Sequence, residues 1–263
     1  MLLPILTPAA LSFEAAPWKG QGWQVVEAQH RVSTLKLVDD FAEQRLLDEI
    51  LDEDKPRIPE ECDLLDVDLS APFRCALAGG YESRFRQSGG VDGVFYASES
   101  IETAVAEMVF LRLQFFAESP ETPWPDDAAD YTALQVGLEH DRAIDLTKGS
   151  FAAEESLWRH PTDHAACHLL GNNAREAGIG LIQYPSEVDP AGGTNLALLS
   201  CTGFASPEPL LRESWRIRLG RLGAQAICDL PQLRLGISFP RSDYAGFARL
   251  AGMVWDRPTT TGH

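Results

Sequence analysis

The sequence lacks the short motifs that identify the commonest nucleotide-binding and metal-binding folds. Its 263 residues contain no GxGxxG and no Walker A sequence, so neither a Rossmann domain nor a P-loop is indicated. The five cysteines include no CxxC pair and are widely scattered, at Cys62, Cys75, Cys167, Cys201 and Cys228. This pattern is typical neither of a disulfide framework nor of a zinc site, and it predicts reduced thiols.

Basic residues and long apolar runs are also scarce. The 22 lysines and arginines face 39 acidic residues, which gives a net charge of −17. A field of that sign repels nucleic acid and anionic membranes, so we expect neither as a partner, whereas a basic protein would suit. No apolar run approaches the ~20 residues of a spanning helix. The apolar N-terminus has no basic n-region, and Pro4 and Pro8 interrupt it, so we expect a cytoplasmic protein without a signal peptide.

The composition is that of a globular protein, with 44% hydrophobic and 23% charged residues, and the length suits one domain with an extension or two small domains. Residues 1–23 show no clear periodicity and are predicted to form an irregular arm. Apolar residues at three- and four-residue steps predict a helix over 35–51. Short strands are predicted at 73–77 and 94–96. The chain shows no internal repeat.

A second helix is expected from Ser98 or Ser100, as its N-cap, to about Glu118. Its predicted apolar stripe consists of Ile101, Ala104, Val105, Met108, Leu111 and Phe115. At 100° per residue, Glu107 lies about 90° from the centre of that stripe. A carboxylate at this margin can be half-buried and still face a cleft.

The second half of the chain alternates further strand and helix signals. A proline-rich acidic loop over 119–130 precedes strand signals at 131–138 and 143–146. A helix capped by Thr162 or Asp163 is expected to end at Gly178. Strands follow at 179–184 and 196–199, with a turn at Gly192-Gly193. Strands scattered among few helices predict a mixed α+β fold.

Several side chains suit the binding of an anionic dinucleotide. A guanidinium donates two parallel hydrogen bonds to phosphate oxygens, and Arg74, Arg84 and Arg86 are concentrated in an otherwise acidic chain. Glu107 and Ser186 add a carboxylate and a hydroxyl. Taken singly, the arginines would more often form surface salt bridges, the glutamate would face solvent, and the serine would begin a turn.

One helical face carries possible metal ligands. His164, Cys167 and His168 stand at i, i+3 and i+4, but no second motif supplies the remaining ligands. Packing or a solvated helix face is therefore the favoured reading, and no metal is expected. Cys167 also lacks the sequence setting of a nucleophile, so a Cys–His protease is not indicated.

The order of five motifs resembles the RES-domain family, whose members are NAD-attacking toxins of two-gene toxin–antitoxin systems. The motifs are Pro72-Phe73-Arg74, Ser83-Arg84, Tyr96-Ala97-Ser98, Glu107, and Tyr184-Pro185-Ser186 with Gly193 and Asn195 behind it. They span roughly residues 72–204, about half of the chain. Single motifs are weak, whereas five in order are fairly specific.

The resemblance has departures and extensions. Glu82-Ser83 replaces the family's paired glycines, and Phe85-Arg86 replaces its Trp-Asn. The long N-terminal segment is similar to that of the larger branch of the family, which makes Arg31 a second-rank site candidate; a structural salt bridge to Asp39 or Asp40 is equally compatible. The predicted organisation is an arm and helical extension over 1–61, a RES catalytic domain over 62–237 and a C-terminal tail over 238–263.

The resemblance implies a fold like that of ADP-ribosylating toxins, a twisted two-sheet core with flanking helices. It implies NAD as substrate, with Glu107, Arg74 and Ser186 acting in catalysis. Binding would fall to Arg74, Arg84, Tyr96, Ser186 and Asn195. The implied partner is a DNA-binding antitoxin that covers the active site.

The outcome of the reaction stays open at this level. Phosphate or water as acceptor would make the protein an NAD phosphorylase or glycohydrolase, and a protein side chain would make it a mono-ADP-ribosyltransferase. A binding module without activity is a further alternative. Homo-oligomerisation is compatible with the sequence, although no heptad argues for it.

Overall fold

The structure, a computed structural model, describes residues 6–28, 43, 58–74, 82–87, 92–229 and 235–260. Its strands are β1 (Ala16–Glu27), β2 (Phe95–Ser98), β3 (Ala129–Asp145), β4 (Leu181–Pro185), β5 (Thr194–Leu198), β6 (Leu211–Gly220), β7 (Gly223–Cys228) and β8 (Gly236–Pro240). The α-helices are α1 (Pro8–Glu14), α4 (Val67–Ser70), α5 (Ile101–Glu118), α6 (Gly149–Ala152), α7 (Glu155–Trp158) and α8 (Ala165–Glu176). Short 3₁₀ helices are η2 (Glu60–Cys62), η3 (Ala71–Phe73), η4 (Cys201–Gly203), η5 (Arg241–Tyr244) and η6 (Ala248–Leu250). The α+β prediction is confirmed.

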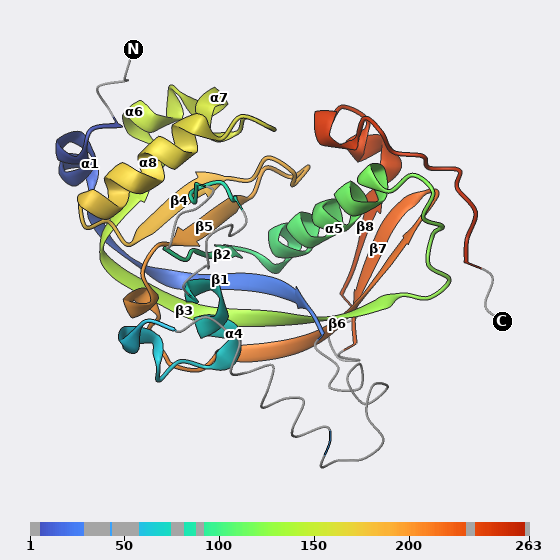
Figure 1. The fold of residues 1–263 in the computed structure, drawn as a ribbon, viewed down its shortest axis with the longest axis horizontal. Coiled ribbons are helices and arrows are strands. Elements are labelled where there is room, and N and C mark those ends of the chain that lie inside the picture. Colours follow the sequence, from blue (N-terminus) through green and yellow to red (C-terminus); the bar gives the residue numbers. More distant parts are fainter. Residues whose placement is uncertain are drawn as a thin grey trace.

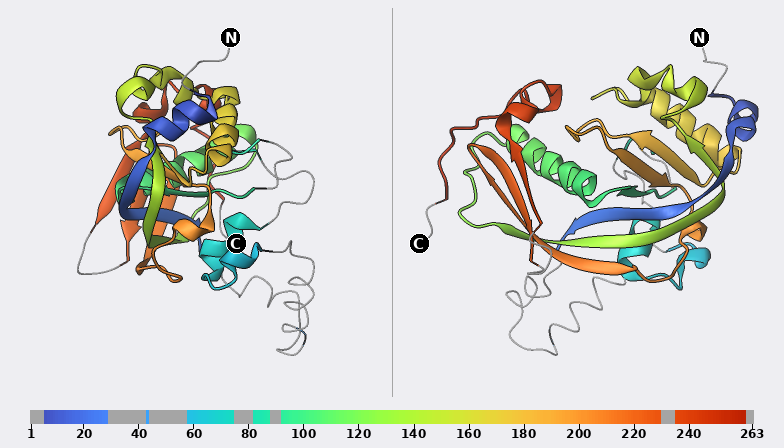
Figure 2. Two further views of the ribbon diagram at one scale, coloured as in Figure 1. Left: turned by 90° about the vertical axis from the view of Figure 1, so that its left-hand side faces the viewer. Right: turned by 180° about the vertical axis from the view of Figure 1, so that it is seen from behind.

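The strands form a sheet in the order β1-β2-β5-β4-β3-β6-β7-β8, and β1 also pairs with β3. The sheet therefore closes on itself through β1, β2, β5, β4 and β3, and β6, β7 and β8 extend from the long strand β3. Figures 1 and 2 show two groups of helices on the same side of the long strands. α5 lies toward one end of these strands, and α1, α6, α7 and α8 lie toward the other.

Separate apolar clusters support the two helix groups. One cluster packs α5 against the sheet and includes Val105, Val109, Trp124 and Trp215. Another packs α8 and its neighbours against β4 and includes Trp158 and other buried side chains. Because each group is fixed to the sheet by its own core, the space between the groups keeps a defined shape.

The N-terminal region differs from the expected irregular arm. Residues 8–14 form α1, where Thr7 caps the helix through its side chain, and 16–27 form β1. β1 pairs with β3 along nearly its whole length. Two glycines and two prolines obscure the strand pattern in this segment, and pairing with β3 outweighs that local sequence preference. The helix predicted over 35–51 lies outside the described residues, apart from Glu43.

Two further element predictions need correction. Residues 71–73 form η3 rather than the start of a strand, and 75–77 lie outside the described residues. The buried face of α5 includes Ala106, Val109 and Leu113, whereas Leu111 and Phe115 of the predicted stripe are 58% and 45% exposed. The reason is that α5 is apolar around most of its circumference, so periodicity alone does not define its buried face.

Other predicted elements are confirmed. Ser100 caps α5, accepting a hydrogen bond from the Thr103 amide. α8 ends before Gly178, which has φ +68°, and Gly192 makes the predicted turn with φ +76°. Such backbone conformations strongly favour glycine. The two strand segments predicted after residue 130 are one continuous strand, β3.

The predicted reduced state of the cysteines is wrong for one pair. Cys62 in η2 and Cys201 in η4 form a disulfide across a sequence separation of 139 residues, and Cys167 is a buried thiol. The two half-cystines belong to an apolar cluster that also contains Phe95 and Ala97 of β2. Spacing along the chain carried no signal of this pair, because only the fold brings η2 beside η4.

Candidate active site

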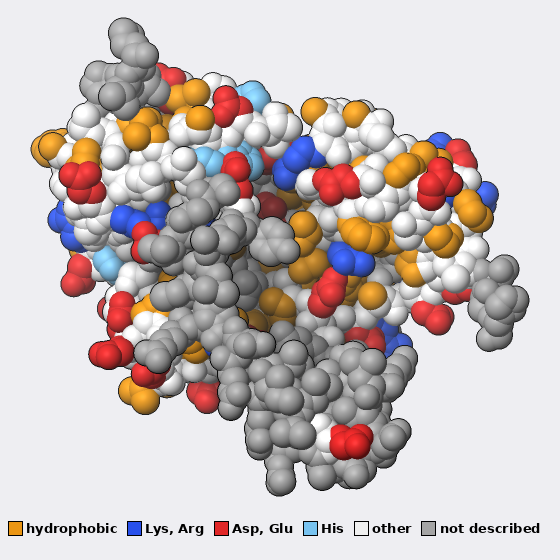
Figure 3. Space-filling view, viewed as in Figure 1, with side chains coloured by type: hydrophobic (Ala, Val, Ile, Leu, Met, Phe, Trp, Pro, Cys, Tyr) orange, Lys and Arg blue, Asp and Glu red, His pale blue; other side chains and the backbone are white. Residues whose placement is uncertain are grey.

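A cleft of about 810 Å³ lies between α5 and the segment that leads into α8. Its lining comes from β1, β2, α5, the loop after β4 and the C-terminal segment. Figure 3 shows this hollow between the two groups of helices, with hydrophobic side chains on the α5 side. A volume of this size is sufficient for a ligand of several hundred daltons.

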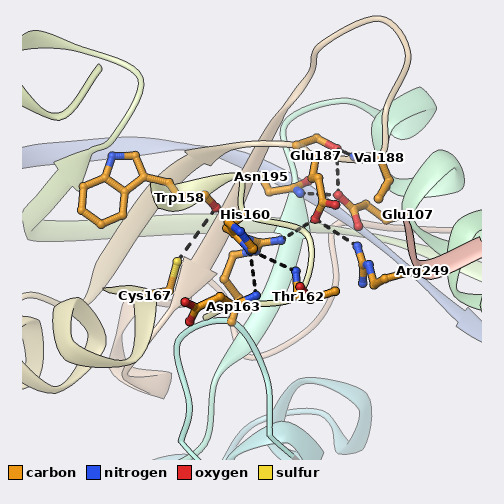
Figure 4. Close-up of polar contacts among 12 residues, drawn as sticks. Glu107, Trp158, His160, Thr162, Asp163, Cys167, Glu187, Val188, Asn195 and Arg249 are labelled. Carbon is orange, nitrogen blue, oxygen red and sulfur yellow. Dashed lines mark hydrogen bonds and ion pairs between the residues drawn. The ribbon is translucent and has the colours of Figure 1, made fainter. Parts of the chain in front are cut away.

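Glu107 is a half-buried carboxylate of this cleft, placed by the second turn of α5. Its Oε1 accepts a hydrogen bond from the Ser186 hydroxyl at 2.8 Å and another from the side-chain amide of Asn195. Figure 4 shows Glu107 and Asn195 joined in this way. Both bonds end on Oε1, so neither residue uses the other carboxylate oxygen.

The loop between β4 and β5 positions these two donors. The Ser186 hydroxyl accepts hydrogen bonds from the amides of Val188 and Asp189, so its own proton is directed to Glu107. Asp189 is buried and accepts from Thr103 on α5 and from the Gly193 amide. The loop is therefore fastened to the helix that carries Glu107.

A buried serine extends the network on the other side. Ser98, at the end of β2, donates to Oδ1 of Asn195 at 2.7 Å. This bond fixes the Asn195 amide so that its nitrogen faces Glu107. Neither residue is exposed by more than 3%. Ser98 was part of the Tyr-Ala-Ser motif but was not predicted as a site residue.

Burial and hydrogen bonding act on Glu107 in opposite directions. Burial raises the pKa of Glu107, and this effect exceeds the opposing effects of the Asn195 and Ser186 hydrogen bonds and of the Arg84 and Arg249 charges. The carboxylate is thus costly to ionise when the cleft holds no cation. A positive charge that develops beside it would favour ionisation.

Arg84 enters the cleft from a short turn, in which Ser83 and Arg86 form an isolated bridge. Its guanidinium donates to the Trp158 carbonyl and to Oε2 of Glu187, the latter at 2.8 Å. The Tyr96 hydroxyl lies 2.9 Å from the Ser83 hydroxyl and accepts from the Phe85 amide at 3.0 Å. Tyr96 therefore lines the cleft and also holds the turn that carries Arg84.

The structure does not bring every predicted residue to the cleft. Arg74 is half-buried at the C-terminal end of η3, and it is not among the described residues that line the cleft. Ser186 is fully buried behind Glu107 and also does not line it. Arg86 is half-buried in the Arg84 turn, and Arg31 lies outside the described residues.

Two cleft residues escaped the sequence reasoning. Glu187 accepts hydrogen bonds from Arg84 and from Arg249, which belongs to η6 near the C-terminus. Figure 4 shows Glu187 and Arg249 side by side near Glu107. Glu187 directly follows the predicted Ser186, which was a possible signal. Arg249 stands in no recognisable motif, so only the fold reveals it.

The structure groups the two histidines of the candidate metal set with Glu82 and not with Cys167. Donor atoms of Glu82, His164 and His168 lie within 4.8 Å of one another at the cleft rim. Burial and the positive charges of Arg84 and Arg249 lower the pKa of His164 to about 4, which keeps the imidazole neutral and does not itself oppose a metal. The same charges would repel a metal ion, so we assign no metal to this cluster.

The fold and cleft define an α+β protein with a half-buried glutamate near two arginines. The RES domain model matches residues 56–220, more than half of the sequence, and the chain belongs to the RES-domain family. Among curated proteins, none matches the sequence. A solved structure similar to this chain is that of the M. tuberculosis MbcT–MbcA toxin–antitoxin complex. The similarity has 12% identity and a TM-score of 0.47, covering 81% of this chain and 92% of that one.

The match lies close to the predicted catalytic domain of residues 62–237 and includes Arg74, Arg84, Tyr96, Glu107, Ser186 and Asn195. It ends within the sheet, at the end of β6, and leaves out β7, β8 and η6. The predicted tail boundary at 237 falls inside β8, which pairs with β7. Among the described residues, no helix has the length and apolar character needed to cross a membrane.

Proposed function

We propose that the cleft binds NAD and that the protein cleaves the bond between nicotinamide and ribose. The observation that carries this proposal is the contact of Glu107 with both Ser186 and Asn195 inside a cleft lined by Arg84 and Tyr96. These residues come from four separate motifs of one family, and they lie in or directly beside one cleft.

The proposed reaction needs a cation stabiliser more than an acid. When the C1′–N bond breaks, its electron pair passes to the pyridinium nitrogen, and nicotinamide leaves as a neutral molecule. The ribose becomes an oxocarbenium-like cation, which the Glu107 carboxylate stabilises. Asn195 and Ser186 hold one oxygen of Glu107, and the other can accept a bond from a ribose hydroxyl.

The remaining roles follow the family resemblance. Arg84 would bind the pyrophosphate bidentately and so orient the ribose, whereas Arg74, which does not line the cleft, is given no contact with the ligand. Tyr96 would flank the nicotinamide ring. Ser186 was predicted to act in catalysis and binding; its bond to Glu107 supports a role in positioning that carboxylate.

We further propose that the protein is the toxin of a toxin–antitoxin pair and that it depletes NAD by phosphorolysis or hydrolysis. A DNA-binding antitoxin would cover the cleft, and the net charge of −17 suits a basic partner. The second candidate is a mono-ADP-ribosyltransferase, because the same ribosyl cation would react with a protein side chain brought to the cleft.

The decisive experiment is to incubate the purified, partner-free protein with NAD, with and without phosphate, and to identify the products by NMR. Nicotinamide release that requires phosphate identifies a phosphorylase, and release without phosphate identifies a glycohydrolase. No release from folded protein would contradict cleavage of free NAD, and release only on addition of a cell lysate would favour the transferase.

Glu107→Gln tests the catalytic assignment. We expect NAD cleavage to fall by ~10²-fold or more, because the amide carries no charge to stabilise the cation. Glu102→Gln is the matched control, since Glu102 is an exposed glutamate of the same helix. Equal cleavage by wild type and Glu107→Gln would exclude the proposed mechanism.

A further inference from the structure

The cleft contains a second arginine that the family match does not cover. Arg249 stands in η6, whereas the RES match ends at residue 220. Its guanidinium lies over the Phe110 ring of α5, 4.5 Å from the ring centroid. Arg249 lines the same cleft as Arg84 and Glu107. The C-terminal segment therefore brings a second cation to the cleft.

Arg84 and Arg249 meet on a single carboxylate oxygen. Oε2 of Glu187 accepts from Nη2 of Arg84 at 2.8 Å and from Nη2 of Arg249 at 3.0 Å. The exposed fractions of the three side chains are 12% for Arg84, 9% for Glu187 and 23% for Arg249. An anionic oxygen at this point thus receives a charge-assisted hydrogen bond from each arginine.

This network has bonding capacity that the protein itself does not use. Among the described residues, Oε1 of Glu187 and Nε of Arg249 are buried and have no hydrogen-bond partner. Buried polar atoms in a finished structural ion pair are normally satisfied. An unused Nε donor on Arg249, with the Arg84 guanidinium bonded to the same carboxylate, is suited to an additional acceptor oxygen, as a phosphate provides.

We propose that Arg84 and Arg249 together form the phosphate-binding site of the cleft, and that Glu187 occupies this site until a phosphate group replaces its carboxylate. The inference rests on the proposed function for the identity of the ligand, a nucleoside diphosphate moiety. Glu187 directly follows Ser186, so movement of Glu187 takes place beside the residue that holds Glu107. The proposed phosphate site therefore lies next to Ser186, which donates to the catalytic carboxylate.

Binding of ADP, which contains the diphosphate but no scissile bond, tests this site apart from catalysis. Calorimetric titration of the full chain should show ADP affinity falling about 10- to 100-fold in Arg249→Ala, because a charge-assisted bond is lost. The ADP affinity of Arg249→Lys should lie between those of the wild type and Arg249→Ala, since lysine keeps the charge without the planar guanidinium. Glu187→Gln should bind ADP several-fold more tightly, because the competing charge is gone.

Arg112→Ala is the matched control. Arg112 also lies over a ring of α5, 5.3 Å from the Phe115 centroid, and is paired with Glu27, but it does not line the cleft. Its ADP affinity should equal that of wild type. Thermal unfolding identifies variants that fail to fold, and Arg249→Lys then provides the test in place of Arg249→Ala.

The outcomes separate this inference from the proposed reaction. Wild-type affinity for ADP in Arg249→Ala and Arg249→Lys, or weaker binding in Glu187→Gln, would overturn the phosphate site even if NAD is cleaved. Failure of the wild type to bind ADP would also overturn it. ADP binding that depends on Arg249, without NAD cleavage, would support the site and contradict the reaction.

Discussion

Glu107 carries two opposing requirements. Desolvation favours its protonated form, whereas the proposed reaction needs the carboxylate, which Asn195 and Ser186 help to retain. Such a balance is typical of groups whose charge matters only when the substrate is bound. Measurements over a range of pH can distinguish the two effects, because desolvation of Glu107 changes the stability of the protein and ionisation of Glu107 changes its activity.

We expect NAD cleavage to decline as pH falls through the raised pKa of Glu107, at a higher pH than for an ordinary glutamate. The contribution of Glu107 to the free energy of unfolding should instead increase as pH falls. Since the folded pKa is raised, the folded state binds more protons than the unfolded state in this interval, so the Glu107 contribution to stability falls as pH rises. Glu107→Gln should therefore unfold at higher urea concentration than wild type at pH 8. A lower midpoint would show that the charge is better stabilised than its burial indicates.

Ser98 offers a second test at the residue scale, because it acts on Glu107 only through Asn195. Ser98→Ala removes the bond to Oδ1, so the Asn195 amide can turn away from Glu107. We expect kcat to fall about 10-fold while KM for NAD changes little. Ser206→Ala changes a half-buried serine that does not line the cleft, and it should leave both constants unchanged. A change confined to KM would assign Ser98 to binding.

At the scale of elements, the turn over 82–87 depends on a strand that is distant in sequence. Its Arg84 is held in place by the Tyr96 hydroxyl of β2 and by the Trp158 carbonyl at the end of α7. The departures from the family pattern, Glu82-Ser83 and Phe85-Arg86, fall within this turn. Ser83 contributes its hydroxyl to the Tyr96 contact, and Phe85 is fully buried, so both substituted positions have a structural task here.

Tyr96→Phe tests the role of the Tyr96 hydroxyl separately from that of its aromatic ring. Loss of the contacts with Ser83 and the Phe85 amide should destabilise the protein by about 1–2 kcal/mol and weaken ADP binding, because Arg84 is no longer fixed. The retained ring should preserve any stacking on nicotinamide, which Tyr96→Leu would remove. Tyr244→Phe is the control, since its buried hydroxyl has no hydrogen-bond partner among the described residues. Unchanged ADP affinity in Tyr96→Phe would mean that the turn holds Arg84 without Tyr96.

For the whole molecule, the disulfide and the cleft lie on opposite faces of β2. Phe95 packs in the cluster that contains Cys62 and Cys201, whereas Tyr96 and Ser98 line the cleft, and Ala97 borders both. The cross-link restricts the unfolded chain over a long loop, so it should contribute to stability without shaping the site.

The double variant Cys62→Ala/Cys201→Ala should unfold with a free energy lower by about 3–5 kcal/mol, measured by urea titration. A reductant should lower the stability of wild type and leave that of the variant unchanged. NAD cleavage by the folded variant should match wild type. If the reductant does not affect the wild type, the two thiols are not joined in solution.

The distribution of charge over the surface is also a property of the whole folded molecule. A chain with a net charge of −17 places Arg84 and Arg249 in one cleft, from segments 165 residues apart. Composition shows the general repulsion of anions, but it does not reveal a local site of opposite sign. Glu187 keeps the two arginines neutralised in part while no ligand is bound.

The sequence by itself determined the local structures and the family. The caps at Ser100 and Gly178, the turn at Gly192 and most short strands follow from residue preferences that act over a few positions. The five motifs around Glu107 could be recognised because each consists of a few neighbouring residues. Only the tertiary structure decided that residues 16–27 form a strand, that Cys62 meets Cys201, that Ser186 lies behind Glu107 and that Arg249 enters the cleft. Each of these depends on contacts between distant segments, whose free energy comes from packing and pairing that no local pattern encodes.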